Sequence, residues 1–139
     1  MPQRRHLEDD QAVALIQWRD TYVRKYPELG LLIAIPNGGK RNAREGARLK
    51  RMGVRAGVSD YFLPVPRFNA GGTIPNTVLQ WDCGLWLELK AAKNKATREQ
   101  GQWLALMRGQ YYAGIVCTGW VAAARAICDY LGLTGSVRP

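Results

Sequence analysis

The sequence has few of the residues that hold zinc or cross-link small proteins. It contains one histidine, His6, and three cysteines, none of which belongs to a Cys-x-x-Cys pair. A structural zinc site needs four such ligands, and a disulfide framework needs paired cysteines. The composition supports neither, and we expect Cys83, Cys117 and Cys128 to be reduced thiols in the core.

Long apolar runs are also missing. No segment approaches the roughly 18 apolar residues that cross a bilayer, and no apolar stretch after a charged start suggests a secretion signal. Of the 139 residues, 47% are nonetheless hydrophobic, which is enough for the core of one ordinary domain. We therefore expect a single soluble, intracellular domain over residues 1–139 that does not contact membranes.

Acidic residues are outnumbered by basic ones. The chain has 20 Lys and Arg against 11 Asp and Glu, for a formal net charge of +9. An excess of this size on a small domain favours a polyanionic partner such as nucleic acid, although merely soluble proteins can be as basic.

Apolar periodicity and turn residues predict an α/β domain with a central mixed sheet of about four strands flanked by helices. The segment 66–82 has no clear period, and we interpret it as a loop, a hairpin arm or a dimer contact. The expected elements are helices from Glu8 to about Tyr26, from Asn42 to about Met52, after Thr97 and over Trp120–Leu131, and strands over Leu31–Ile35, Tyr61–Val65, Leu85–Lys90 and 114–119.

A carboxylate and an ammonium stand two residues apart in an otherwise apolar strand, at Glu88 and Lys90. Because side chains alternate along a strand, both face away from Leu85, Leu87 and Leu89. On a solvated edge strand such an ion pair would have no functional role. The helix and strand that follow place this strand inside the sheet, where unpaired charges are costly, and we therefore favour a functional pair.

Asp60 follows a turn and opens the preceding strand, so we expect it beside Glu88. Two carboxylates about 4 Å apart repel by roughly 4 kcal/mol at an effective dielectric of about 20, which favours a cation between them. Oxygen ligands without His or Cys indicate Mg²⁺, with Mn²⁺ as a substitute. Together with Lys90 this set predicts phosphodiester hydrolysis. Taken alone, Asp60 is also compatible with a turn or cap role.

Four ordered blocks extend the pattern over almost the whole chain: IPNGGKRN, GVRAGVSDYFLPVPR, GLWLELKAAKNKATREQGQWL and CTGWVAAARAICDYL. An Asp at a strand start followed by Glu-x-Lys resembles the PD-(D/E)xK nuclease superfamily, and the blocks together resemble its stand-alone VRR-NUC (virus-type replication-repair nuclease) proteins of phages and bacteria. The resemblance implies a restriction-endonuclease-like core, a divalent metal, branched DNA such as Holliday junctions as substrate, a homodimer, and the cytoplasm of a bacterium or phage-infected cell. The segment from Phe68 to Asp82 is longer than expected for that family.

The same resemblance implies roles for the residues of the strand motif. Asp60 and Glu88 would be metal ligands, the backbone carbonyl of Leu89 would complete the protein's share of the coordination, and Lys90 would be the catalytic lysine.

Two further positions have open alternatives. Gln100 stands where the family carries a glutamine near the catalytic site, but it also fits the third position of a helix capped by Thr97. Glu8 would be a metal ligand from the first helix, although the Gln usually found four residues later is replaced by Ala12, with Gln11 beside it. An acidic residue near a helix start is also favourable by itself.

Basic residues gather on one predicted helix, on its flanks and after the Glu-x-Lys strand. A solvated basic face is the ordinary explanation, but next to Asp60 they also predict a track for DNA phosphates, each neutralised phosphate adding about 0.9 to the salt dependence of binding. Asn37-Gly38-Gly39 lacks the frame of a P-loop, so we expect no nucleotide cofactor. The candidate DNA-binding residues are Lys40, Arg41, Arg44, Arg48, Lys50, Arg51, Arg55, Lys93 and Lys95.

Two functions follow from these observations. The first is a metal-dependent, structure-selective DNA endonuclease that resolves Holliday junctions as a homodimer. The second is a nucleic-acid-binding module that has kept the fold and the basic surface without turnover. The complete set of Asp60, Glu88 and Lys90 favours the first, because a module has no reason to hold repelling carboxylates together.

Overall fold

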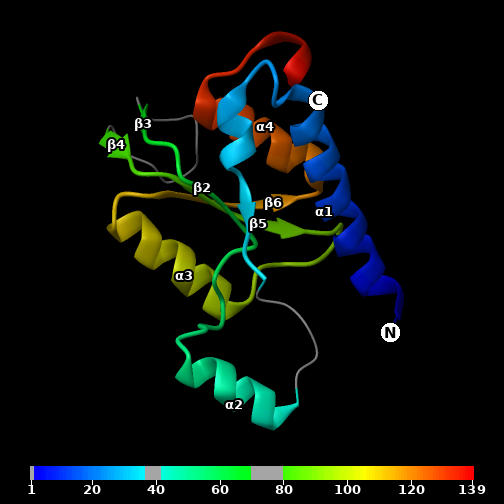
Figure 1. The fold of residues 1–139 in the computed structure, drawn as a ribbon, viewed down its shortest axis with the longest axis vertical. Coiled ribbons are helices and arrows are strands. Elements are labelled where there is room, and N and C mark those ends of the chain that lie inside the picture. Colours follow the sequence, from blue (N-terminus) through cyan, green and yellow to red (C-terminus); the bar gives the residue numbers. More distant parts are fainter. Residues whose placement is uncertain (1, 37–41, 70–79) are drawn as a thin grey trace.

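The computed structural model describes residues 2–36, 42–69 and 80–139, and its helices and strands form an α/β domain (Figure 1). The helices are α1 (Pro2–Tyr22), α2 (Ala43–Arg51), α3 (Arg98–Gly109) and α4 (Trp120–Leu131), with 3₁₀ turns η1 (Pro27–Leu31) and η2 (Gly135–Val137). The strands are β1 (Ile33–Ala34), β2 (Tyr61–Leu63), β3 (Arg67–Asn69), β4 (Gln80–Asp82), β5 (Leu85–Lys90) and β6 (Ala113–Thr118). Within these ranges, no helix has both the length and the apolar character needed to span a membrane.

The central sheet has four strands in the order β1-β2-β5-β6. The first two pairings are antiparallel and the last, between β5 and β6, is parallel, so the sheet is mixed as predicted. β5 lies between β2 and β6, which confirms that the Glu-x-Lys strand is an interior strand.

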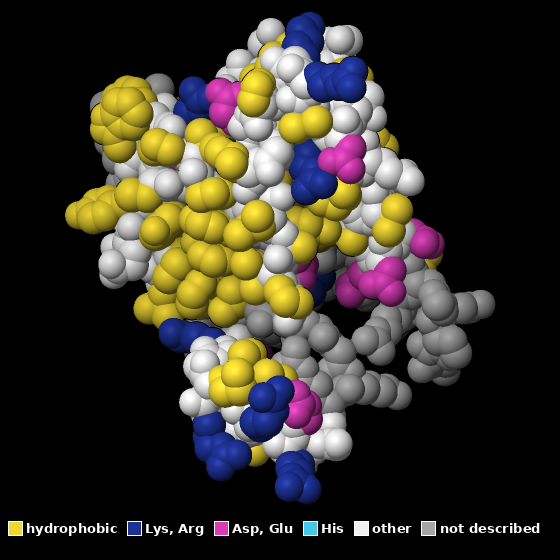
Figure 2. Space-filling model, in the orientation of Figure 1, with side chains coloured by type: hydrophobic (Ala, Val, Ile, Leu, Met, Phe, Trp, Pro, Cys, Tyr) yellow, Lys and Arg dark blue, Asp and Glu magenta, His cyan; other side chains and the backbone are white. Residues whose placement is uncertain are grey.

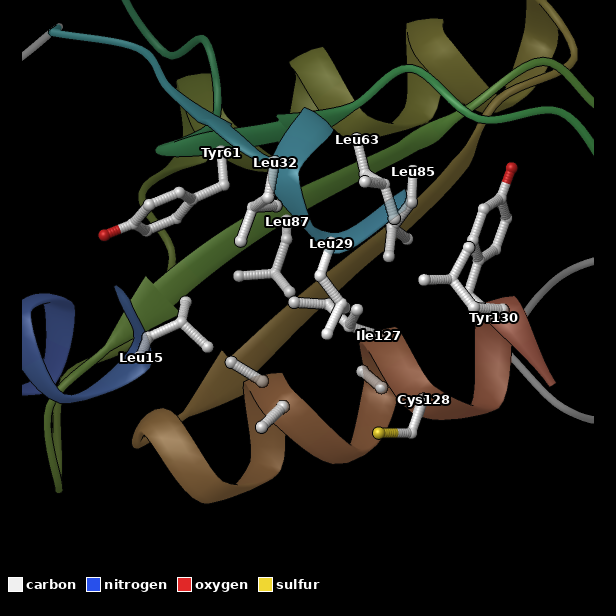
Figure 3. Packing of buried hydrophobic residues seen from close by; sticks show 14 of the residues in the cluster. Leu15, Leu29, Leu32, Tyr61, Leu63, Leu85, Leu87, Ile127, Cys128 and Tyr130 are labelled. Atoms are coloured by element: carbon white, nitrogen blue, oxygen red, sulfur yellow. The ribbon is translucent and has the colours of Figure 1, made fainter. Parts of the chain in front are cut away.

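The two faces of the sheet have different coverings. On one face Leu85 and Leu87 of β5 pack with Leu15 of α1 and Ile127 of α4, and all four side chains are fully buried (Figure 3). On the other face the helix α3 supplies Trp103, whose ring lies 5.2 Å from that of Trp86. The predicted alternation of β5 is therefore confirmed, and the Glu88 side of the strand faces α3.

Local chemistry sets three helix ends, including the predicted cap at Thr97 and Gln100. The side chain of Asn42 accepts the N–H of Glu45 at the start of α2. Thr97 and Gln100 form a reciprocal capping box at the start of α3. Gly132 ends α4 in the left-handed conformation, which glycine adopts without steric cost.

The N-terminal third differs from the sequence prediction. α1 begins at Pro2 and ends at Tyr22, because the carbonyl of Tyr22 accepts the N–H groups of Lys25 and Tyr26 in a turn that leads into η1. The buried strand expected over Leu31–Ile35 is wrong, since β1 has only two residues, both exposed at the edge of the sheet.

β2 is shorter than predicted and lies inside the sheet. It ends at Leu63, because Pro64 has no N–H to continue the ladder. Val65 is buried, but its N–H bonds back to Leu63 instead of to a neighbouring strand. A proline within a strand suggests either an edge position or a short strand, and here the strand is short but lies between β1 and β5.

The ends of the aperiodic segment form a second, two-stranded sheet. β3 and β4 pair antiparallel, with Phe68 opposite Trp81, which agrees with the hairpin-arm interpretation. Residues 70–79 between them lie outside the described part of the chain. Cys83, just after β4, is exposed, so its predicted place in the core is wrong, whereas Cys117 and Cys128 are buried and reduced as expected.

Candidate active site

Two carboxyl groups meet at one end of β2 and β5. Tyr61 pairs with Leu87, so Asp60, one residue before β2, comes opposite Glu88. The two carboxyl groups are close enough for the charge of Asp60 to raise the pKa of Glu88. The structure therefore brings together the two acids that the sequence pointed to.

The backbone of Leu89 faces the same acidic pair. Its N–H donates to Asp60 Oδ2 at 2.8 Å. Because the N–H and C=O groups of one strand residue point to the same side of the strand, the carbonyl oxygen of Leu89 also faces the Asp60 side. It is available as an oxygen ligand beside the two carboxylates.

Lys90 and Gln100 both bind one oxygen of Glu88. Lys90 Nζ lies 2.8 Å from Glu88 Oε1, and Gln100 Nε2 donates to the same oxygen. Glu88 is fully buried and Lys90 is 9% exposed. The second carboxylate oxygen, Glu88 Oε2, is also buried and receives no hydrogen bond from the residues that the structure describes.

Burial dominates the electrostatics of this group. It raises the pKa of Glu88 to about 7, and the charge of Asp60 adds to the effect while Lys90 opposes it. Burial also raises the pKa of Asp60, more than the Leu89 N–H and Lys90 lower it. For Lys90, burial lowers the pKa, but the hydrogen bond and charge of Glu88 outweigh it and leave a net rise. Glu88 therefore holds a proton readily near neutral pH, and Lys90 stays cationic.

The donor set fits a hard cation that has few protein ligands. Across the described ranges, no three side chains of Asp, Glu, His or Cys form a group able to hold a metal by themselves. Mg²⁺ commonly binds through one or two carboxylates and completes its shell with water and substrate oxygens. Asp60, the unbonded oxygen of Glu88 and the Leu89 carbonyl are a set of that kind.

A cavity of about 340 Å³ is lined by Asp60, Lys90 and Gln100 and also by Glu8 of α1. Glu8 Oε1 accepts a hydrogen bond from Asn94 Nδ2 at 2.8 Å. Glu8 is thus close enough to influence the cavity and is held in place by the turn after β5. Asn94 was not predicted from the sequence, because a polar residue in a turn carries no periodic signal.

Gln11, one turn along α1 from Glu8, has a different role. Its side-chain oxygen accepts the N–H of Trp120 at 2.8 Å, at the start of α4. The N-cap residue of α4 is Gly119, which has no side chain for this purpose. Gln11 therefore caps α4 from another helix and fixes α1 next to the cavity.

One wall of the cavity depends on a glycine. Gly57 has a φ of +84°, and a Cβ there would lie 2.6 Å from the backbone of Glu99. Only glycine lets the segment before Asp60 pack this closely against the first turn of α3. The Gly57 segment and the helix that carries Gln100 therefore form adjoining walls of the cavity.

The two roles considered for Gln100 are compatible in this structure. Its Oε1 accepts the N–H of Thr97 at 2.7 Å, and its backbone N–H donates to Thr97 Oγ1 at 3.3 Å. The Nε2 of the same side chain donates to Glu88. One amide therefore caps α3 and binds the buried carboxylate.

The basic residues of α2 lie apart from the acidic pair. α2 has no buried residue, and Figure 2 shows Lys and Arg side chains projecting from several sides of the lower lobe, where Figure 1 places this helix. Arg48 forms an exposed ion pair with Glu45 at 2.9 Å. Lys40 and Arg41 lie outside the described residues. The remaining candidates Arg44, Lys50, Arg51, Lys93 and Lys95 are exposed.

Arg55 differs from the cations of α2 because its guanidinium is held against an aromatic ring. The central carbon lies 5.4 Å from the centroid of the Trp103 ring, a cation–π distance. Arg55 immediately precedes the segment 56–58 that lines the cavity. It is therefore a candidate DNA contact with a defined position close to the acidic pair.

One of three comparisons with known proteins finds a similar fold. No protein-family model and no curated protein matches the sequence. Among solved structures the chain is similar to a "VRR_NUC domain protein", with a TM-score of 0.69 and 24% sequence identity over 91% of this chain and 89% of that one. The chain thus has the α/β fold of a VRR_NUC domain protein, as the sequence resemblance implied.

Proposed function

We propose that the chain is a divalent-metal-dependent, structure-selective endonuclease that hydrolyses phosphodiester bonds in DNA. One observation carries the proposal: a fully buried glutamate, Glu88, is held by Lys90 and Gln100 beside a second carboxylate, Asp60. Such an arrangement is costly unless a cation and a reaction use it. The nuclease-type fold supports the same function.

The metal in this proposal is Mg²⁺, with Mn²⁺ as a working substitute. Asp60, Glu88 and the Leu89 carbonyl would hold it, and Glu8 is the remaining candidate ligand. When bound, a cation of this kind polarises a phosphoryl oxygen and lowers the pKa of a water. The all-oxygen donor set favours such a hard ion over zinc.

Lys90 supplies a fixed positive charge at the reacting phosphate. Its pKa is raised, so it remains an ammonium, and its contact with Glu88 keeps it in the cavity. An ammonium has three donors, and the donors left after Glu88 can bind a phosphate oxygen or orient the attacking water. Lys90 thereby stabilises the negative charge that develops in the transition state. Gln100 also donates a hydrogen bond to Glu88 and restricts the rotation of its carboxylate.

The exposed cations bind the DNA backbone. α2 provides Arg44, Arg48, Lys50 and Arg51, and the turn after β5 provides Lys93 and Lys95. Their exposure suits contacts with phosphates, which release counterions and make binding sensitive to salt. Lys40 and Arg41, next to α2 in the sequence, belong to the same proposed track.

Branched DNA such as a Holliday junction is the proposed substrate, cut by a homodimer. A C2 dimer sets two active sites at a fixed distance, which matches a two-fold symmetric junction. Exposed apolar side chains of Leu106 and Tyr111, at the end of α3 and just after it, support a contact between two copies. Sedimentation at working concentration tests this part, and a monomer would remove it.

Cleavage of a substrate panel tests the function. Fluorescently labelled four-way junction, flap and linear duplex are incubated with Mg²⁺, Mn²⁺ or EDTA. We expect cleavage with either metal, preference for the junction, and no products in EDTA. Tight, salt-sensitive binding without cleavage in any metal would instead identify a binding module.

A further inference from the structure

The amide of Gln100 has only one orientation that satisfies both of its neighbours. The N–H of Thr97 is a donor and needs an acceptor, which Gln100 Oε1 provides at 2.7 Å. Ionised Glu88 accepts only and needs a donor, which Gln100 Nε2 provides. A flipped amide would set a donor against a donor and an oxygen against the carboxylate, so both bonds would be lost.

The cap of α3 fixes this orientation. Thr97 Oγ1 accepts the backbone N–H of Gln100, which holds the first turn of the helix against the extended residue 97. The same turn brings the side chain of Gln100 back to the N–H of Thr97. A helix start that usually serves stability alone therefore determines which atom reaches the buried glutamate.

Two donors on one oxygen leave the other oxygen of Glu88 unoccupied. Gln100 Nε2 and Lys90 Nζ both bind Oε1, which fixes the rotation of the carboxylate. Oε2 is buried and receives no donor from the described residues, and Asp60 is the neighbouring acid. The carboxylate is thus presented to a cation through one defined oxygen.

We infer that Thr97 is a positioning residue that acts through Gln100 to orient Glu88 for a divalent cation. The inference rests on the proposed function and adds to it a residue that lines the cavity without being one of the proposed metal ligands. Partners that orient a metal ligand change metal affinity about 10- to 100-fold when they are removed.

Mn²⁺ binding to the DNA-free protein, measured by calorimetry, tests this chain of contacts. Thr97→Val removes the hydroxyl and should weaken Mn²⁺ binding about tenfold. Thr97→Ser keeps the hydroxyl and should bind within about twofold of the wild type, because serine caps helices as well as threonine does. If Thr97→Val does not fold, Thr97→Gly also lacks the hydroxyl and is a better helix cap than valine.

Tyr130→Phe is the control for lost stability alone. Tyr130 donates a buried hydrogen bond to Val65 O and belongs to the core on the other face of the sheet (Figure 3). This variant should melt at a lower temperature and bind Mn²⁺ like the wild type. An unchanged Mn²⁺ affinity in Thr97→Val, with a fall in Tm like that of Tyr130→Phe, would overturn the inference.

A double-mutant cycle separates positioning from a general structural role. If Thr97 acts only through Gln100, Thr97→Val in a Gln100→Met background should cause no further loss of Mn²⁺ affinity. Independent, multiplying effects of the two substitutions would contradict the inference. Failure of the wild type both to bind Mn²⁺ and to cleave DNA would instead reject the proposed function itself.

Discussion

The acidic end of β5 and the basic helix α2 hold their charges in opposite ways. Glu88 is fully buried and Lys90 nearly so, and each is bonded to a specific partner. α2 buries no residue, and its cations face solvent (Figure 2). Buried charges must have their partners in place before a substrate arrives, whereas exposed charges are screened and largely interchangeable. We therefore assign the chemistry to the first region and the affinity for DNA to the second, and four substitutions or conditions test that division.

The largest effect is expected for Lys90→Ala. Loss of a charge that stabilises the transition state should reduce the cleavage rate roughly 100- to 1,000-fold while DNA binding stays within about threefold. Single-turnover cleavage and fluorescence anisotropy measure the two quantities. Lys25→Ala, at an exposed lysine outside the proposed DNA-binding track, is the matched control and should cleave at nearly the wild-type rate. Cleavage by Lys90→Ala within tenfold of the wild type would show that Lys90 has only a structural role.

Neutralising α2 should have the reverse effect. The triple variant Arg44→Gln, Lys50→Gln, Arg51→Gln is expected to weaken DNA binding tens of fold at low salt and to lower the salt slope by about 2 to 3. The cleavage rate at saturating DNA should not change. The triple variant Arg24→Gln, Lys25→Gln, Arg125→Gln removes three charges from exposed positions outside α2 and is the control for net charge alone. Equal losses in both proteins would mean that α2 is not a specific DNA contact.

The stability of the metal-free protein should depend on pH through Glu88. Burial raises the pKa of Glu88 from 4.5 to about 7, so between these values the folded state holds a proton that the unfolded state has lost. Stability should therefore fall as the pH rises from about 5 to 7, by about 1 to 3 kcal/mol. Urea unfolding over this range measures the slope, and Glu88→Gln should flatten it. An unchanged slope in Glu88→Gln would mean that another group is responsible.

The smallest global effect is expected for Asn42→Ala. This change removes the N-cap of α2, but α2 buries nothing, so the midpoint of global unfolding should shift by less than about 1 °C. Amide hydrogen exchange within α2 should nevertheless become faster. A large fall in Tm would show that α2 packs on the body of the protein and is not an independent basic arm.

Sequence patterns predicted the interior of the sheet and the residues of the acidic pair. Because side chains alternate along a strand, Leu85, Leu87 and Leu89 face the core and their charged neighbours face the opposite side of the sheet. Asp60 follows the turn before the neighbouring strand, which places it beside Glu88. These are local patterns with a fixed period, so a single sequence is enough to read them.

Contacts between distant segments were not predictable in the same way. The Asn94–Glu8 and Gln11–Trp120 hydrogen bonds join residues 86 and 109 positions apart, and neither polar residue has a periodic neighbour that reveals its partner. The local sequence pattern predicts Ile33 in a buried strand, but its side chain is 48% exposed. Its burial depends on η1 and on its position at the edge of the sheet, which the local pattern does not reveal.

A crystal of the protein soaked in Mn²⁺ tests the central claim most directly, because anomalous scattering locates the ion without reference to activity. The account predicts one strong peak in contact with the carboxylates of Asp60 and Glu88 and with the carbonyl oxygen of Leu89. A crystal that shows no peak between these carboxylates, prepared from protein that cleaves DNA with Mn²⁺, would contradict it.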